Sequence, residues 1–261
     1  MMRSKKAILF NISLVIVTII VLTTALITLD QANPFRQGIG SKAFDAVVLY
    51  QKAETSMFYA DQSAKLSAQQ TAYDLAQKGG FYNESKCGEK EGYAIWSDGT
   101  DKDCYPEYKT EFQKKFNDIM KEYLNPLLPS SAGYELSFID KMIIGVPQWA
   151  RFFSGIYGSS KNRLSFNINI GYDINEYKDL ITKAENLVSE CNNDIGCVNN
   201  KADEYKWNLI EGTENIFKFS AETDTKVLVK NAEDEVSYES ITYKFALYVP
   251  VNETASASTA E

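Results

Sequence analysis

The chain has 261 residues, of which 44% are hydrophobic and 13% aromatic, and this content predicts a folded core rather than a disordered chain. Its length is sufficient for one substantial domain or two small ones. The formal net charge of −8 argues against nucleic-acid binding, because an acidic surface repels phosphates.

The first predicted element is a membrane-spanning helix over Ala7–Leu29. This stretch contains no charged residue, and at about 1.5 Å per residue it is long enough to cross roughly 30 Å of hydrocarbon. Arg3, Lys5 and Lys6 precede it, a charge distribution that keeps the amino terminus in the cytoplasm. The sequence therefore predicts a single-pass protein of the cell membrane, which contacts the bilayer through Ala7 to Leu29 and carries an extracytoplasmic domain.

A cleaved secretory signal is the alternative interpretation of the same stretch. Thr23 and Ala25 are small residues suited to a cleavage site, but the apolar run continues to Leu29, beyond the length of about 7–15 residues usual for a signal. We favour the uncleaved anchor, and both interpretations export the domain. The threonine hydroxyls in this stretch either bond back to helix carbonyls or contribute to a helix-pairing face.

Residues 30–40 are predicted to be a connector, because Pro34 and the glycines after it disfavour a helix. Ser41 is a candidate N-cap for a long helix that runs to about Lys78 and ends at Gly79 and Gly80. We interpret it as the central core helix of the exported domain, with a self-association seam as the alternative. Apolar residues recur along it at helical spacing, among them Ala46, Val47, Leu49, Tyr50, Ala53, Met57, Phe58, Ala60 and Ala64.

Four cysteines follow the predicted anchor, and an even number in an exported domain indicates two disulfides. Three pairings are open. We favour Cys87 with Cys104 and Cys191 with Cys197, because the members of each pair are close in sequence. A zinc site is disfavoured, because the chain has no histidine and no Cys-x-x-Cys sequence.

Residues 81–105 are predicted to form a loop closed by Cys87 and Cys104. Asp98, Asp101 and Asp103 lie within it as candidate oxygen ligands for a weak calcium site, but their spacing is not that of an EF-hand, and we prefer a solvated turn. Asn83 and Asn252 begin Asn-x-Ser/Thr sequences and are candidates for glycosylation.

The middle of the chain predicts a helix over 105–124, a strand pair or a strand with a turn over 134–146, and a half-buried strand over 163–170. An aromatic patch lies before the last of these. Such clusters are more often core than a contact surface for a ligand or membrane. The patch consists of Trp149, Phe152, Phe153 and Tyr157.

The last part predicts a helix over 175–189, a further helix to about residue 209, and strands over 216–219, 226–229 and 240–248. Residues 251–261 form a predicted disordered tail. The predicted fold class is α+β: an N-terminal transmembrane helix (1–29), the connector (30–40), and an exported domain (41–250) with a long helix packed on a mostly antiparallel sheet.

The composition argues against catalysis. Without histidine, the commonest general base and the Ser–His and Cys–His nucleophile systems are missing. The chain also has no Ser-x-x-Lys sequence and no glycine-rich phosphate loop. Paired carboxylates stay open, because folding brings acidic residues together. We therefore predict a protein without catalytic activity, metal or cofactor, with a carboxylate-dependent glycan hydrolase as an alternative.

Three stretches carry a resemblance: the KKAILF start, the helix SAKLSAQQTAYDLAQKGG and the strand ITYKFALYVP. With them the chain resembles uncharacterised single-span exported proteins of small-genome archaea, a resemblance that covers most of the chain and implies no known activity. The span followed by an Ala-rich helix is also similar to type IV pilin-like proteins. Here, however, no glycine precedes the apolar run, no glutamate occupies its fifth position, and Pro34–Gly40 interrupts the helix.

These observations predict a membrane-anchored extracytoplasmic protein that acts in binding or envelope assembly. An envelope protein or a glycan is the expected partner, and self-association is an open alternative. A pilin-like filament subunit is the second functional hypothesis.

Overall fold

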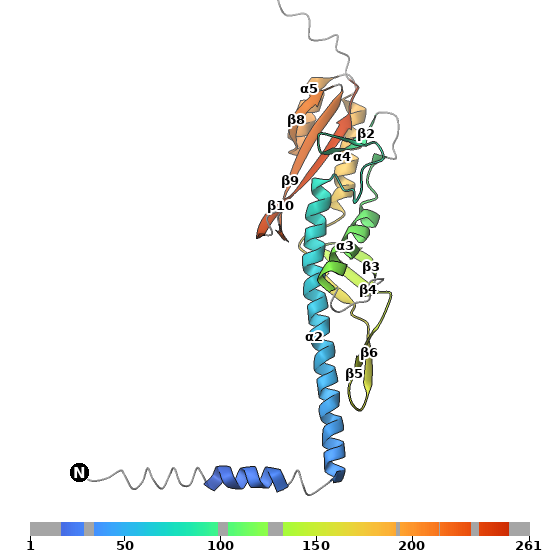
Figure 1. Cartoon of the computed structure of the whole chain (residues 1–261). Helices are drawn as coiled ribbons and strands as arrows, with labels where there is room; N and C mark the ends of the chain where they lie inside the picture. Colours follow the sequence, from blue (N-terminus) through green and yellow to red (C-terminus); the bar gives the residue numbers. More distant parts are fainter. Residues whose placement is uncertain are drawn as a thin grey trace, which may run out of the picture. The chain divides into compact units, whose positions relative to one another are not determined.

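The computed structural model describes residues 17–28, 34–98, 104–124, 133–191, 194–213, 215–230 and 235–250. It has the predicted α+β composition, with a long helix and mostly antiparallel strands (Figure 1). The chain divides into two compact units. Unit 1 comprises Met1–Glu54 and Phe152–Lys161, and unit 2 comprises Thr55–Arg151 and Asn162–Glu261.

The predicted membrane-spanning helix is the part of the fold that the structure corrects. Of the helices within the described residues, none is both long enough and apolar enough to cross a membrane. Within Ala7–Leu29, a helix is described over residues 17–28. A helix of this length extends about 18 Å, against roughly 30 Å of hydrocarbon. Residues 7–16 and 29 of the predicted span lie outside the described residues.

Helix α2 (Pro34–Gln77) begins before the predicted Ser41, so the segment predicted as a connector is helical from Pro34 on. Proline is compatible with a first turn, whose N–H groups have no partner within the helix. The carboxyl end agrees with the prediction. The Gly80 N–H donates to the Leu75 carbonyl at 2.7 Å, and Gly79 and Gly80 have positive φ. This arrangement is a Schellman cap.

In unit 2, the second half of α2 is a core helix. Every fourth residue is an alanine with at most 1% of its surface exposed, and such small side chains let neighbouring elements pack closely against the helix backbone. The core interpretation therefore holds for this half of the helix. The alanines are Ala60, Ala64, Ala68, Ala72 and Ala76.

Gly79 is required by its conformation and by its surroundings. Its φ is +62°, and a Cβ there would lie 2.8 Å from both the Lys244 carbonyl oxygen and the Ala94 Cβ. We expect Gly79→Ala to lower the free energy of unfolding by about 2–4 kcal/mol, from left-handed strain and overpacking together. Urea denaturation measures this.

Gly171 provides the control for that substitution. Its φ is +75°, and a Cβ there would meet nothing within 4 Å. Gly171→Ala should therefore cost only the conformational strain, about 1–2 kcal/mol. Equal losses for the two variants would show that the collision at Gly79 is unimportant.

Unit 2 contains a five-stranded sheet in the order β1-β2-β10-β9-β8 (Figure 1). Strand β10 pairs antiparallel with β9 and parallel with β2. Strands β1 and β2 lie in the segment predicted as a loop, and β9 is one continuous strand where two were predicted. The bounds are β1 (Glu89–Lys90), β2 (Tyr93–Ser97), β8 (Asn208–Thr213), β9 (Ile216–Lys230) and β10 (Val236–Tyr248).

A three-stranded antiparallel sheet in the order β3-β4-β7 and three further helices complete unit 2. The predicted strand pair after residue 134 is confirmed as β3 and β4. The predicted extension of the last helix to residue 209 is wrong, because Lys206 adopts a left-handed conformation that ends α5. The bounds are α3 (Tyr108–Leu124), β3 (Tyr134–Ile139), β4 (Met142–Pro147), β7 (Phe166–Asn169), α4 (Glu176–Glu190) and α5 (Ile195–Tyr205).

Phe245 on β10 lies at the centre of an aromatic cluster in unit 2. Its ring stacks on Trp96 with centroids 4.1 Å apart and meets Trp207 edge-on at 5.0 Å. Phe219 on β9 stacks at 5.7 Å. Phe245 is fully buried, so this cluster joins β2, β9 and β10 to the segment after α5.

Candidate interaction surface

In unit 1, a two-stranded hairpin of β5 (Arg151–Ser154) and β6 (Ser159–Asn162) packs against the first half of α2. The Asp45 carboxylate on α2 accepts hydrogen bonds from the backbone N–H groups of Ile156 and Tyr157, at 3.1 and 2.9 Å. Gly155 makes this approach feasible, because a Cβ there would lie 2.4 Å from an Asp45 carboxylate oxygen. The hairpin turn therefore closes on one carboxylate of the helix.

Asp45 belongs to a stripe along α2 that continues with Leu49 and Ala53. Residues four apart lie on the same side of a helix. Leu49 and Ala53 form a small buried cluster with Phe153 of β5. One side of this half of α2 is therefore occupied by the hairpin.

Apolar residues on the other side of this half of α2 are exposed to solvent. Phe44, Val47 and Tyr50 follow one another at intervals of three, turned away from the Asp45 stripe by the helical period. The hairpin adds exposed apolar side chains of its own. We use the name apolar surface of unit 1 for the exposed apolar side chains of both places, the free side of α2 and the hairpin. They are 54% to 86% exposed and are Phe44, Val47, Tyr50, Phe152, Ile156 and Tyr157.

The predicted aromatic patch is split by the structure. Phe152 and Tyr157 are exposed, whereas Phe153 is buried and Trp149 packs in part against the core of unit 2. Strand geometry explains the difference between Phe152 and Phe153, because neighbouring side chains of a strand point to opposite sides. Lys161 on β6 lies over the Phe152 ring, with its Nζ 5.3 Å from the ring centroid.

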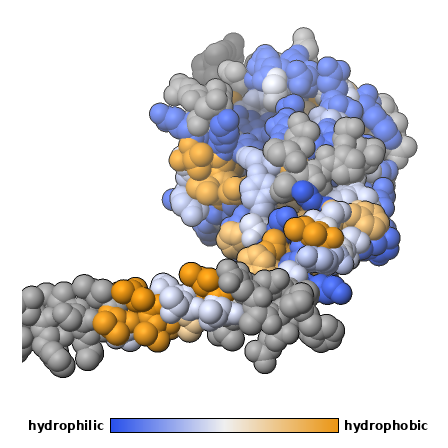
Figure 2. Space-filling model, turned by 60° about the horizontal axis from the view of Figure 1, so that its bottom comes forward, coloured by the Kyte–Doolittle hydropathy of each residue, from blue (hydrophilic) through white to orange (hydrophobic). Residues whose placement is uncertain are grey.

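The helix over 17–28 has no charged residue and is mostly apolar. Its threonine hydroxyls donate back to helix carbonyls; that of Thr24 lies 2.7 Å from the Ile20 oxygen, and that of Thr28 lies 2.8 Å from the Thr24 oxygen. Figure 2 shows its hydrophobic side chains in orange. A helix of this kind is stable only where other apolar groups cover it. It is therefore a second candidate contact surface. Its large side chains are 54% to 62% exposed: Val17, Ile19, Ile20, Val21, Leu22, Leu26 and Ile27.

Both favoured cysteine pairs are joined in the structure. Cys87 and Cys104 have Cα atoms 5.7 Å apart, and Cys191 and Cys197 have Cα atoms 5.2 Å apart. Disulfides of this kind persist in oxidising compartments.

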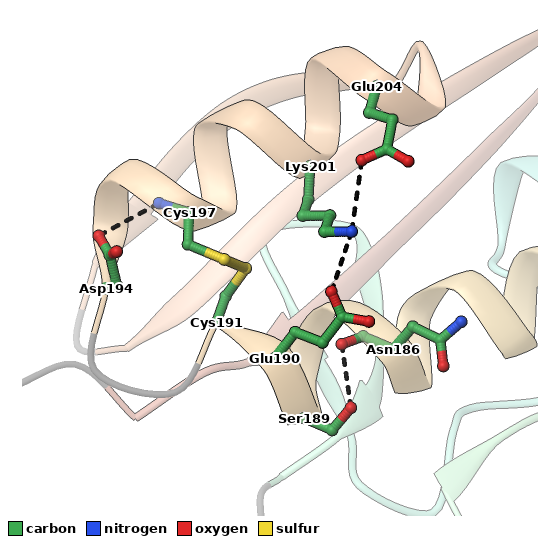
Figure 3. The surroundings of a disulfide bond; sticks show 8 residues. All are labelled: Asn186, Ser189, Glu190, Cys191, Asp194, Cys197, Lys201 and Glu204. Carbon is green, nitrogen blue, oxygen red and sulfur yellow. Dashed lines mark hydrogen bonds and ion pairs between the residues drawn. A yellow bond between two sulfur atoms is a disulfide. The ribbon is translucent and has the colours of Figure 1, made fainter.

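The second disulfide ties the end of α4 to the first turn of α5 (Figure 3). Asp194 caps α5 by accepting a hydrogen bond from the Cys197 N–H at 3.2 Å. Lys201 on α5 then bridges Glu190 on α4 at 2.9 Å and Glu204 at 3.3 Å. Hydrogen bonds to these two carboxylates raise the pKa of Lys201. The α4–α5 junction is thus held by covalent, capping and ionic contacts.

Asn83 is exposed and lines a polar cavity of about 580 Å³ together with Lys78 and Glu89. The hydroxyl of Ser85, in the same Asn-x-Ser sequence, is buried and donates to the Ile95 carbonyl at 2.8 Å. Asn252, the other glycosylation candidate, lies outside the described residues.

Of the three candidate calcium ligands, Asp98 belongs to the described residues. Asp98 lies beside the first disulfide, with its Oδ2 3.8 Å from the Cys87 Sγ. The donor atoms of Cys87, Asp98 and Cys104 lie within 4.8 Å of one another, but the two sulfurs are bonded to each other and are not thiolate ligands. Asp101 and Asp103 lie outside the described residues.

Sequence reasoning missed Phe44 and Ile156, and it placed Val47 and Tyr50 in the apolar stripe of a core helix, whereas the structure has both exposed. A usable signal was the width of the apolar stripe on the long helix, which exceeds what one buried side requires. Comparison of the chain with protein-family models, curated proteins and solved structures finds no match.

Proposed function

We propose that the protein is a self-assembling subunit of an extracytoplasmic envelope structure. In this proposal, the helix over 17–28 of one copy lies on the apolar surface of unit 1 of the next copy. The observation that carries it is the presence of two uncovered apolar surfaces on one chain. Large exposed apolar patches mark interaction sites, because leaving them in water is unfavourable.

The two surfaces match in length and in chemistry. A helix over 17–28 extends about 18 Å, and the part of α2 from residue 41 to 54 extends about 21 Å. The first has no charged residue. On the second, the carboxylate of Asp45 is already bonded to the hairpin backbone. Seating one on the other would therefore bury the apolar side chains of Phe44, Val47 and Tyr50, and the charged Glu54 on the same side lies at the end of this stretch.

A contact between two different surfaces of identical chains is heterologous, and such contacts repeat into filaments or rings instead of closing as a dimer. The helical start of α2 at Pro34 also removes one departure from the pilin pattern. The lack of a glycine before the apolar run and of a glutamate at its fifth position still stands. We therefore propose assembly through these surfaces without pilin-type processing.

An extracytoplasmic location follows from the same proposal. All four cysteines of the chain are paired in two disulfides. This pairing supports the proposal that the protein resides in an oxidising compartment. An acidic chain, with a formal charge of −8, repels both nucleic acid and anionic lipid. The partner that we propose is a second copy of this chain, held by apolar contact between the two surfaces rather than by charge.

The test compares three forms of the full chain in mild non-ionic detergent by sedimentation velocity. The wild type should form oligomers. A surface variant, Phe44→Ser with Ile156→Ser, and a helix variant, Leu22→Asp with Leu26→Asp, should each be monomeric. Burial of a large apolar side chain contributes about 1.5–3 kcal/mol, so two losses weaken association roughly a hundredfold or more.

Mixing the two variants is the decisive arm. The surface variant keeps its helix and the helix variant keeps its surface, so an equimolar mixture should form a 1:1 dimer that grows no further. Val236→Ser with Tyr238→Ser is the matched control, because these side chains are 64% and 70% exposed in unit 2. This control should oligomerise like the wild type. A monomeric wild type that instead floats with lipid vesicles would overturn the proposal, as would a mixture that stays monomeric.

A further inference from the structure

Unit 2 contains a cavity of about 230 Å³ that plays no part in the proposed assembly. It is bounded by α4, the segment that ends α5, β9 and β10. Trp207, Leu180 and Ala221 supply apolar lining, while Glu176, Asp179 and Glu222 supply carboxylates. The volume is below the roughly 300–1,000 Å³ of drug-sized ligand sites, so only a small molecule fits.

Glu176 is the least accessible of the three carboxylates, and its side chain is short of hydrogen-bond donors. The Tyr243 hydroxyl lies 3.1 Å from Glu176 Oε2 and 2.9 Å from the Tyr172 hydroxyl. Tyr243 has one proton to donate, so it serves Glu176 only when Tyr172 donates to Tyr243 in turn. Glu176 is partly buried, whereas Asp179 and Glu222 are exposed.

The groups around Glu176 also disfavour its charged form. Burial raises the pKa of the Glu176 carboxyl, and the neighbouring carboxylates of Asp173 and Asp179 raise it further, against the hydrogen bond from Tyr243 and the charge of Lys141. None of the three carboxylates of this lining, Glu176, Asp179 and Glu222, is held in an ion pair within the described residues.

Two lysines lie at the outer part of the same cavity. Lys206 is exposed at the end of α5, and Lys183 is exposed on α4 with its Nζ 5.6 Å from the centre of the Tyr205 ring. The cavity lining thus combines carboxylates, aromatic side chains and ammonium groups. An ammonium ligand is favoured by the carboxylates of this lining, and a carboxylate ligand is favoured by its lysines.

We propose that this cavity binds a small zwitterion of the free amino acid class. The ammonium group of the ligand donates to the Glu176 carboxylate, within the negative field of Asp179 and Glu222. Its carboxylate pairs with Lys206 at the exposed side. An ammonium group brings three N–H donors, which is what the Glu176 side chain lacks.

The experiment is isothermal titration of the full chain with alanine, methylammonium, acetate and glucose. Alanine should bind, and methylammonium and acetate should bind more weakly, because each has only one of the two charges. Glu176→Gln, which keeps the shape of the side chain, should weaken alanine binding by about tenfold or more. Asp224→Asn is the matched control, because Asp224 is exposed on the same strand as Glu222 but does not line the cavity. It should leave alanine affinity unchanged.

A second variant keeps the test valid if Glu176→Gln folds poorly. Lys206→Asn places a residue that tolerates the left-handed conformation of this position and removes its charge. It should weaken alanine binding while leaving methylammonium binding as it was. Failure of alanine to bind, binding of glucose in its place, or alanine affinity that neither variant changes would each overturn the proposal. The assembly proposal is unaffected by these outcomes, because the surfaces belong to unit 1.

Discussion

Phe245→Ala is expected to lower the free energy of unfolding by about 3–5 kcal/mol, the usual cost of removing a buried phenylalanine side chain. The physical reason is the cavity left among Trp96, Trp207 and Phe219, all of which contact the Phe245 ring. Aromatic pairs add about 0.5–1.5 kcal/mol beyond area burial. Because domains have a total stability of about 5–15 kcal/mol, one substitution would remove a large part of it. Urea denaturation followed by tryptophan fluorescence measures the loss.

Tyr238→Ala is the control on the same strand. Tyr238 is 70% exposed, whereas Phe245 is fully buried, and exposed substitutions usually change stability by less than about 0.5 kcal/mol. A similar loss for both variants would contradict the placement of Phe245 at the centre of the core. Phe245→Leu should fall between the two, because leucine fills part of the space.

Removal of the Cys87–Cys104 disulfide by Cys→Ala substitution at both positions should cost about 3 kcal/mol. The sequence separation is 17 residues, and the loop-entropy model relates the cost to the length of the loop that the disulfide closes. The Cys191–Cys197 disulfide closes a separation of only 6 residues, so its removal should cost less, about 2 kcal/mol. Urea denaturation without reductant compares the two double variants.

The order of the two losses is the informative result. A larger loss from Cys191 and Cys197 would show that the α4–α5 junction of Figure 3 contributes more than chain entropy does. The variant in which all four cysteines are replaced by alanine should lose the sum of the two free energies, because distant sites contribute independently.

Features that depend on local chemistry were predictable from the sequence. The end of α2 at Gly79 and Gly80 follows from the tolerance of glycine for positive φ. The two local disulfides follow from cysteine spacing. The end of α5 was not predictable, because Lys206 caps it in a left-handed conformation that lysine does not signal. The first two residues of its neighbour β8, Asn208 and Leu209, were accordingly predicted as helix.

Long-range pairing explains the missed strands. β2 pairs with β10, opposing Ala94 to Phe245, and no local pattern relates two segments so far apart in sequence. β9 continues through the polar residues Glu222 to Thr225, which were predicted as a turn. The antiparallel pairing with β10 shifts its register here, between Glu222 opposite Thr242 and Lys226 opposite Ser240, so the polar residues form a bulge inside one continuous strand.

The candidate interaction surface was predictable only in part. Phe152 and Tyr157 were predicted as a contact surface or as core, and local sequence does not decide between these, because both are apolar. Whether they are covered depends on how far the hairpin packs on α2, which Asp45 and Gly155 determine through contacts of more than a hundred residues in sequence separation. The carboxylates of the unit 2 cavity are likewise joined by tertiary packing.

The position of β10 between β2 and β9 has a consequence for biosynthesis. The ribosome makes β2 and β9 first, and β10 is the last strand of the described sheet to emerge. Until then the nascent chain lacks the segment that joins the two halves of the sheet, and their unpaired edges stay open to wrong partners. Completion of this sheet is therefore deferred until β10 has been translated.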